Sequence, residues 1–169
     1  MSARTDNSLK LEEFLPYRLS VLSNTVSAAI SDAYAGRFGL SVPEWRVLAI
    51  LGRYPGLSAS EVAERGAMDK VAVSRAVSRL LDEGRIKRRF AAADRRRSIL
   101  ELSARGREVY ANITPLARRY EKALLQGLSH EERRLFETLL DKLLHRAHAL
   151  GSAGSGTEAS QHRASRDSS

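Results

Sequence analysis

The chain has 169 residues, 43% of them hydrophobic, so it is long enough to bury one hydrophobic core and too short for two domains of ordinary size. Lysine and arginine outnumber aspartate and glutamate by 28 to 20, and the net charge of +8 makes a polyanion the first partner to consider. The chain contains no cysteine, which excludes a disulfide framework, a thiolate zinc site and a sensor that works by cysteine oxidation.

The N-terminal segment holds no apolar run of signal-peptide length, and no later run is long enough to span a membrane, so we expect a cytoplasmic protein. We expect residues 1–8 to be flexible. From 9 to 38, apolar residues recur at steps of three or four, which predicts a long amphipathic helix. Pro16 marks either a kink or the first turn of the main part of this helix, because proline lacks the amide proton that an interior position donates.

Three later helix starts are predicted by the Ser-x-x-Glu capping box, in which each side chain satisfies an otherwise unpaired backbone amide. The boxes are Ser41 with Glu44, Ser58 with Glu61, and Ser129 with Glu132. The first two predict helices at about 42–53 and 59–66. Asp69 caps a further helix that ends at Gly84, a residue able to take the left-handed conformation past a helix end. This region therefore predicts two short helices joined by a tight turn.

Two β-compatible runs follow, at 86–90 and 98–102, and the polar segment 91–97 between them predicts a hairpin tip, or wing. Apolar periodicity then predicts a helix from about 104 to 127 and a last helix from about 130 to 150. The fold class is therefore mainly α with a small β-hairpin wing. The remaining tail, 151–169, has almost nothing to bury, and we expect it to be disordered.

The helix at 69–83 has two faces of different chemistry. At about 100° per residue, its apolar residues fall in one sector. The residues opposite are Val71, Ser74, Arg75, Ser78 and Arg79. In a helix-turn-helix this second helix lies in the major groove, where short serines permit a close approach and arginine reaches a phosphate or the edge of a guanine. An ordinary solvated helix face is the alternative interpretation.

Most of the excess positive charge lies between Arg85 and Arg97, where seven basic residues stand against one acid, Asp94. Composition alone favours a solvated charged face. The position of this stretch directly after the two-faced helix favours a second DNA contact, because arginine is attracted to the negative potential of a narrow minor groove. The candidates at the wing are Arg95, Arg96 and Arg97.

The stretch from Ser58 to Gly106 resembles the signature of the MarR family of winged helix-turn-helix regulators. The resemblance rests on MDKVAVSR at the start of the second helix, DRRR in the wing and SARG at the opening of the next helix. EWRVLAIL upstream and the long flanking helices extend it to 9–150. Leu81 departs from the family pattern, as does Arg85, which is a candidate for a further phosphate contact.

The resemblance implies roles for individual residues. Ser74 and Arg75 match positions that contact the major groove, and Arg96 matches the arginine at the wing tip. The flanking groove positions are Lys70 and Ser78. Asp94 matches the wing aspartate, which pairs with a nearby arginine and fixes the loop.

By the same resemblance, the helices at 9–38 and 104–150 pack against those of a second subunit and flank a DNA-binding lobe at 41–103. A homodimer presents two recognition helices, so the operator should be a pseudo-palindrome with half-sites roughly 10 base pairs apart. Family members typically respond to small, often aromatic and anionic ligands in a cleft between these parts. The candidate contacts are Tyr17, Arg18, Trp45 and Arg46, although a tryptophan such as Trp45 is more often a core residue.

Two residue groups have structural alternatives that we favour. Ser58 and Ser60 stand at a helix N-terminus, whose free amides attract anions, and are candidates to hold a DNA phosphate; simple capping is the alternative. Asp141, His145 and His148 are spaced to lie near one another on the last helix, as in a metal sensor. A polar helix edge is the favoured interpretation, and we expect neither a metal nor a cofactor.

These observations predict a sequence-specific transcriptional regulator, by family default a repressor, that a small ligand releases from its operator. A ligand-independent architectural DNA-binding protein is the alternative, and it would bind all sequences with similar affinity. An enzyme is not expected, since no Ser/His/Asp arrangement, glycine-rich phosphate loop or pair of carboxylates stands out.

Overall fold

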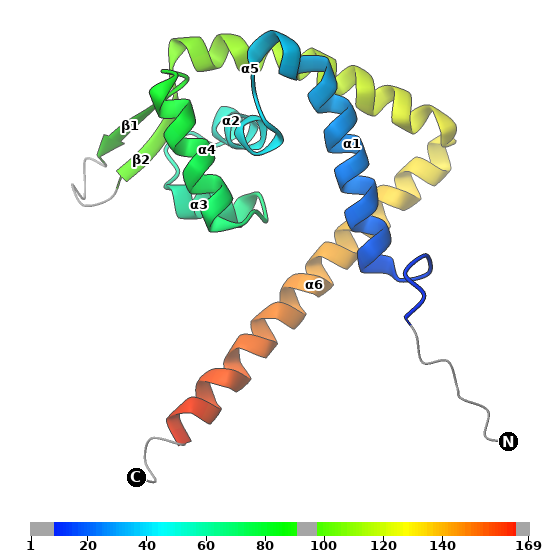
Figure 1. Cartoon of the computed structure of the whole chain (residues 1–169). Helices are drawn as coiled ribbons and strands as arrows, with labels where there is room; N and C mark the ends of the chain where they lie inside the picture. The colour runs from blue at the N-terminus through cyan, green and yellow to red at the C-terminus, as the bar shows by residue number, and fades with distance from the viewer. Residues whose placement is uncertain (1–8, 91–97, 165–169) are drawn as a thin grey trace, which may run out of the picture. The chain divides into compact units, whose positions relative to one another are not determined.

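The structure is a computed structural model in which residues 9–90 and 98–164 are described, the stretch 152–164 for its backbone alone. It is mainly helical with one two-stranded antiparallel hairpin (Figure 1), which confirms the predicted fold class. The elements in chain order are α1 (Leu15–Phe38), α2 (Val42–Arg53), α3 (Ala59–Arg65), α4 (Lys70–Asp82), β1 (Ile86–Phe90), β2 (Ser98–Leu102), α5 (Ala104–Leu124), a 3-10 turn η1 (Leu125–Gly127) and α6 (His130–Ala164). The chain divides into two compact units, Met1–Tyr120 and Glu121–Ser169, with the boundary inside α5.

The start of α1 differs from the prediction. The helix begins at Leu15 with Pro16 in its first turn, so Pro16 marks the start of the helix. A proline one turn further in would clash with a carbonyl group of the preceding turn, and the helix therefore does not extend back to residue 9. Leu11–Glu13 form a turn instead. At the other end, Gly39 takes the left-handed conformation, with a φ of 62°, and closes the helix.

The hydrophobic core that positions the site lies among α2, α3, α4 and the hairpin. α4 packs against α2, α3 and β1. Burying each leucine or valine side chain stabilises the fold by about 1.5–3 kcal/mol, so this shared core fixes which face of α4 turns outward. Its buried residues on these elements are Val47, Leu48, Leu51, Val62, Ala63, Val73, Ala76, Val77, Leu80, Ile86, Leu100 and Leu102, and Tyr34, Leu40, Val109 and Ile113 complete the core.

The two strands pair over the full length that the sequence predicts, from Ile86 opposite Leu102. On its other side β2 bridges to the segment between α2 and α3, because Leu100 donates its N–H to the carbonyl oxygen of Leu57 at 2.8 Å. The base of the hairpin is thereby tied to the helical core. The predicted wing tip, 91–97, lies outside the described residues.

Ser103 and Gly106 of the SARG motif connect the start of α5 to the turn after α4 by hydrogen bonds. Oγ of Ser103 lies 2.7 Å from the carbonyl oxygen of Gly84 and 3.0 Å from that of Arg85, and it accepts the N–H of Gly106 at 3.0 Å. These bonds join the turn after α4 to the first turn of α5. The SARG motif, one of the motifs on which the family resemblance rests, therefore has a structural role in this fold.

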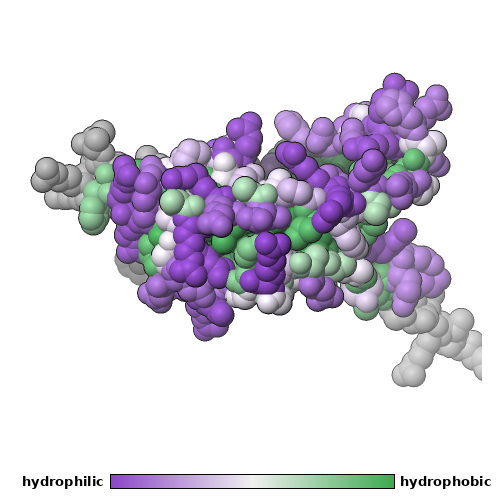
Figure 2. Space-filling view, turned by 90° about the horizontal axis from the view of Figure 1, so that it is seen from above, coloured by the Kyte–Doolittle hydropathy of each residue, from purple (hydrophilic) through white to green (hydrophobic). Residues whose placement is uncertain are grey.

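Apolar side chains are exposed on both α1 and α6. On α1 they include Leu15, Leu19 and Leu22. The exposed apolar residues of α6 are Leu135, Phe136, Leu139, Leu140, Leu143, Leu144 and Leu150. On the face of the molecule shown in Figure 2, hydrophobic groups lie at the surface between hydrophilic ones. Exposed apolar surface of this extent is typical of a surface that binds another protein.

The end of α6 also differs from the prediction. The helix continues to Ala164, whereas the sequence predicts a disordered tail from residue 151. Once a helix has formed, each further residue adds a backbone hydrogen bond at a small entropic cost, so a helix can continue through a stretch that buries little. Across the ranges that the structure describes, no helix combines the length and the apolar composition needed to cross a membrane.

Candidate nucleic-acid interface

The start of α4 is set by a cap and a tight turn. Oδ1 of Asp69 accepts the backbone N–H of Ala72 at 2.9 Å, which confirms the predicted N-cap. In the turn before it, Ala67 has a φ of 46°, a left-handed conformation that disfavours residues with a side chain. α3 and α4 are therefore joined as a helix-turn-helix requires.

α4 has the two faces that the sequence predicts. One face lies in the core. The exposed residues, which include all those predicted to contact DNA from this helix, are Lys70, Val71, Ser74, Arg75, Ser78, Arg79 and Asp82. Val71 is 57% exposed, a large fraction for an apolar side chain, and suits contact with the methyl group of a thymine. The outer face thus combines short, apolar and basic groups.

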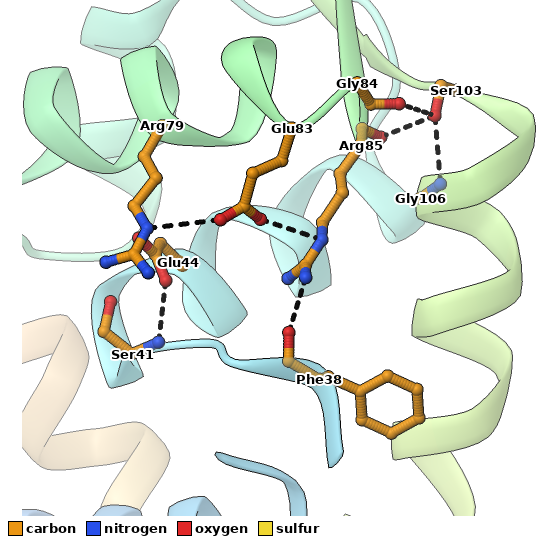
Figure 3. Close-up of polar contacts among 9 residues, drawn as sticks. All are labelled: Phe38, Ser41, Glu44, Arg79, Glu83, Gly84, Arg85, Ser103 and Gly106. Atoms are coloured by element: carbon orange, nitrogen blue, oxygen red, sulfur yellow. Dashed lines mark hydrogen bonds and ion pairs between the residues drawn. The ribbon is translucent and has the colours of Figure 1, made fainter. Parts of the chain in front are cut away.

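Arg79 is engaged within the protein. Its Nε lies 3.2 Å from Oε1 of Glu44 and 3.3 Å from Oε1 of Glu83, and Figure 3 shows both carboxylates beside the guanidinium. The side chain of Glu44 is only 4% exposed, and a buried carboxylate needs a cationic partner. The pair therefore holds α4 against the start of α2. The spacing of four residues could have predicted the Arg79–Glu83 pair, but no local pattern indicates the contact with Glu44.

Arg85 does not face outward, and the prediction that it contacts a phosphate is wrong. Its side chain is 9% exposed, its Nε lies 3.0 Å from Oε2 of Glu83, and its Nη2 donates to the carbonyl oxygen of Phe38 (Figure 3). The N–H of Arg85 Nε does not point at the Glu83 carboxylate with hydrogen-bond geometry, so this contact is an ion pair without a hydrogen bond. The guanidinium turns inward because it supplies a partner to a carboxylate and a carbonyl group that solvent reaches poorly.

A hollow of about 320 Å³ lies between α4 and the start of α2. Arg75 and Arg79 line it from α4, and Pro43 and Glu44 line it from α2. The two arginines are one helical turn apart and lie on the same side of α4. The outer face of α4 is therefore continuous with the ion pair that anchors the helix.

Ser58 is the N-cap of α3. Its Oγ accepts the N–H of Glu61 at 3.3 Å, and its own N–H is donated to Oε2 of Glu61 at 2.7 Å, which completes the predicted capping box. This hydroxyl has its partner within the helix, which supports capping over phosphate binding. Ser60 is exposed in the first turn. The box of Ser129 and Glu132 is also complete, at the start of α6.

The base of the wing carries basic residues, two of which are paired. Lys87 and Arg89 on β1 lie 3.4 and 3.5 Å from Oε2 of Glu101 on β2. Arg88, between them, is exposed. The remaining wing residues with predicted roles lie outside the described residues, and their roles stay predictions: Asp94, Arg95, Arg96 and Arg97.

Trp45 packs between two tyrosines. Its ring centroid lies 5.8 Å from that of Tyr34 on α1 and 6.0 Å from that of Tyr110 on α5, and it borders the core, which supports the core role of Trp45. Burial raises the pKa of the Tyr34 hydroxyl above its ordinary value of 10.0, and the nearby side chain of Ser31 and the charge of Arg46 partly oppose the shift. Nothing in the sequence singles out Tyr34, which belongs to the apolar stripe of α1.

The other candidate ligand residues lie in two places. Arg46 donates from Nη2 to Oγ of Ser27 on α1 at 2.9 Å, next to the aromatic cluster. Tyr17 and Arg18 line an open pocket of about 370 Å³ near the start of α1. Tyr17 and Ser27 are separated along α1 by about 15 Å, so the structure does not bring the predicted residues into one pocket.

Asp141, His145 and His148 of α6 are exposed. Within the part of the chain that the structure describes, no three histidine, aspartate or glutamate side chains lie close enough together to hold a metal ion.

Known proteins with similar sequences and structures are transcriptional regulators. Residues 38–97 match the MarR family. The chain is 31% identical over 131 residues to an HTH-type transcriptional repressor of Mycobacterium tuberculosis, a match that covers 77% of this chain and 91% of that protein. A MarR/EmrR family transcriptional regulator from Acinetobacter sp. ADP1 has a TM-score of 0.75 and 27% identity over 82% of this chain and 98% of its own. The PcaV transcriptional regulator of Streptomyces coelicolor, solved with its natural ligand, resembles this chain in fold. The TM-score is 0.68, with 24% identity over 83% of this chain and 98% of PcaV.

Proposed function

Since this chain belongs to the MarR family of transcriptional regulators, we propose that it is a repressor that binds a pseudo-palindromic operator as a homodimer and is released by a small aromatic or anionic ligand. The relatives described above are transcriptional regulators. Binding to double-stranded DNA is therefore the activity that the geometry has to explain.

The observation that carries the proposal is the pair of faces on α4. The buried face fixes the rotation of the helix, and the exposed face offers groups that suit the edges of bases. Ser74 and Ser78 permit a close approach, and Arg75 is long enough to make a bidentate contact with guanine. Each such contact discriminates against a wrong base by about 1–3 kcal/mol.

Additional contacts come from the wing in this proposal. The wing would enter the minor groove next to the major-groove site of α4 through Arg95, Arg96 and Arg97. The negative potential of a narrow minor groove attracts arginine. Asp94 would hold the loop through an ion pair with one of these residues. Contacts of this kind contribute affinity and salt dependence more than sequence preference.

Pairing of two subunits is supported by the exposed apolar faces of α1 and α6. A two-fold dimer presents two copies of α4, and half-sites roughly 10 base pairs apart would place each copy in the major groove on the same side of the duplex. The operator should therefore be a pseudo-palindrome.

For the ligand, the surroundings of Arg46 are the better supported of the two candidate places. Arg46 supplies a cation beside the aromatic cluster of Tyr34, Trp45 and Tyr110, which suits an aromatic anion. The pocket at Tyr17 and Arg18 is the second place. A ligand that favours a subunit spacing unsuited to DNA needs about 1.4 kcal/mol of coupling to lower DNA affinity tenfold.

The experiment begins with the selection of duplexes from a random-sequence library by the purified protein. Fluorescence anisotropy at physiological salt then compares a selected duplex with a scrambled duplex of the same composition. A preference of about a thousandfold or more, together with an inverted repeat in the selected sequences, supports the proposal. Equal and steeply salt-dependent binding to both duplexes supports the architectural alternative instead. A panel of aromatic carboxylates added to the complex tests ligand release.

A further inference from the structure

Glu44 makes two contacts from one buried carboxylate. Its Oε2 accepts the backbone N–H of Ser41 at 2.7 Å, as a capping residue of α2, and its Oε1 lies 3.2 Å from Nε of Arg79 on α4. A capping glutamate at a surface helix needs no arginine, as Glu132 at the start of α6 illustrates. The ion pair with Arg79 is therefore a feature that capping does not explain.

The geometry at Arg79 orients its guanidinium. Glu44 and Glu83 both approach Nε, from α2 and from the end of α4 itself. Both of these contacts are made at Nε, and the arginine side chain remains 59% exposed although its partner Glu44 is buried, so the guanidinium is still within reach of an acceptor outside the protein. An exposed guanidinium that is held at Nε loses less conformational freedom when it binds, which preorganises the arginine for phosphate or base recognition.

Glu83 extends the contact to a further part of the fold. Its second carboxylate oxygen pairs with Arg85, which in turn donates to the carbonyl oxygen at the end of α1. Figure 3 shows Arg79, Glu83 and Arg85 in one row. Of the two carboxylates that hold Arg79, Glu83 at the end of α4 is thus tied to the end of α1 through Arg85, and Glu44 comes from a different helix, α2.

We propose that Glu44 is a positioning residue for DNA recognition, which never touches DNA but fixes Arg79 so that its Nη groups meet the operator one turn after Arg75. This inference rests on the proposed function, because it requires α4 to lie on DNA. In the absence of Glu44, Arg79 keeps its charge and its contact with Glu83 but loses the buried partner that holds it against α2. Glu44 therefore contributes to the preference for the operator over other DNA and contributes little to nonspecific attraction.

The test is Glu44→Gln, which keeps the length of the side chain and an oxygen for the capping bond but removes the charge. Binding is measured by fluorescence anisotropy on the duplex selected by the wild-type protein and on its scrambled version. We expect the affinity for the selected duplex to fall about tenfold, and that for the scrambled duplex to change by less than about twofold. Glu132→Gln, the same change in a capping box without such an arginine, should leave both affinities unchanged.

A double-mutant cycle separates positioning from a structural role. In an Arg79→Ala background, Glu44→Gln should have no further effect on operator affinity, because the group that it orients is absent. Arg79→Lys, which keeps the charge without the planar fork, should lose operator affinity as Glu44→Gln does and keep the salt dependence of the wild type. Glu83→Gln, which acts on the same Nε, provides the test if Glu44→Gln does not fold.

Three results would overturn the inference. Equal losses on both duplexes would make Glu44 a structural residue, and so would an effect of Glu44→Gln that persists without Arg79. Tighter operator binding by Glu44→Gln would mean that Glu44 withholds Arg79 from DNA. The failure of the wild-type protein to prefer any selected duplex would contradict the proposed function itself, which distinguishes that failure from the others.

Discussion

The carbonyl oxygen of Arg85 occupies the space that a Cβ on Gly106 would need. The two residues belong to the turn after α4 and to the first turn of α5, and Ser103 bonds to both. The close backbone approach fixes where α5 leaves the DNA-binding lobe, and only glycine permits it.

Gly106→Ala should therefore destabilise the protein by about 3 kcal/mol, since the atom in the way belongs to the backbone and cannot rotate aside. Urea unfolding followed by circular dichroism measures the change. Gly36→Ala is the matched control, because a Cβ there meets nothing within 4 Å, and it should leave stability unchanged or raise it by up to about 1 kcal/mol. Similar stabilities for the two variants would contradict the close approach.

Arg85→Met should lower stability by about 2–3 kcal/mol without altering the salt dependence of DNA binding. The loss follows from the removal of a buried cation from Glu83 and from the carbonyl group of Phe38, and it is moderated because Glu83 is 29% exposed. Arg88→Met, on the exposed side of β1, should change stability by less than about 0.5 kcal/mol. A salt slope that falls by about one unit in Arg85→Met would show that Arg85 contacts a phosphate after all.

Tyr34→Phe should be at least as stable as the wild type at neutral pH, because the buried hydroxyl makes no well-formed hydrogen bond to a described residue. Because burial raises the native pKa of Tyr34, the unfolded chain releases this proton first as the pH passes about 10. The stability that the protonated hydroxyl contributes is complete below that pH and is lost as the pH rises through the native pKa.

Unfolding by urea at neutral pH and above pH 10 measures this difference, and the advantage of Tyr34→Phe over the wild type should grow at the higher pH. Tyr54→Phe, which removes a hydroxyl from an exposed tyrosine, is the control. If Tyr34→Phe lost stability at neutral pH, Tyr34 would have a partner that the structure does not show.

Ala67→Gly should raise stability by about 0.5–1 kcal/mol. Ala67 has a φ of 46°, a conformation that glycine adopts without the steric cost of a Cβ. Thermal unfolding compares it with Ala111→Gly inside α5, where the same change should lower stability by about 1 kcal/mol. A loss in both variants would mean that the turn between α3 and α4 carries no strain.

Much of the DNA-binding lobe could be predicted from local patterns. The capping box of Ser58 with Glu61, the cap at Asp69 and the two short strands depend on residues a few positions apart, and the structure shows each of them. The two faces of α4 follow from helical periodicity in the same way. Such features depend on residues that are close together in the sequence, so a local sequence pattern is enough to predict them.

Contacts between distant parts of the chain could not be predicted. Arg85 looks like one more member of a basic run, yet it turns inward because Glu83 and the end of α1 offer it partners. Glu44 carries the pattern of a capping residue, and its pairing with Arg79 depends on how α2 packs against α4. The direction in which a charged side chain points is decided by tertiary structure, which a local pattern does not contain.

The central claim is that the exposed face of α4 reads the sequence of the DNA, and Arg75→Ala compared with Arg96→Ala tests it most directly. Both variants are titrated by fluorescence anisotropy on the selected duplex and on its scrambled version, over a range of salt concentrations. Arg75→Ala should lose about tenfold or more in affinity for the selected duplex and most of its sequence preference, whereas Arg96→Ala should weaken binding to both duplexes and flatten the salt dependence. If Arg75→Ala kept the sequence preference of the wild type, the outer face of α4 would not be the surface that recognises DNA.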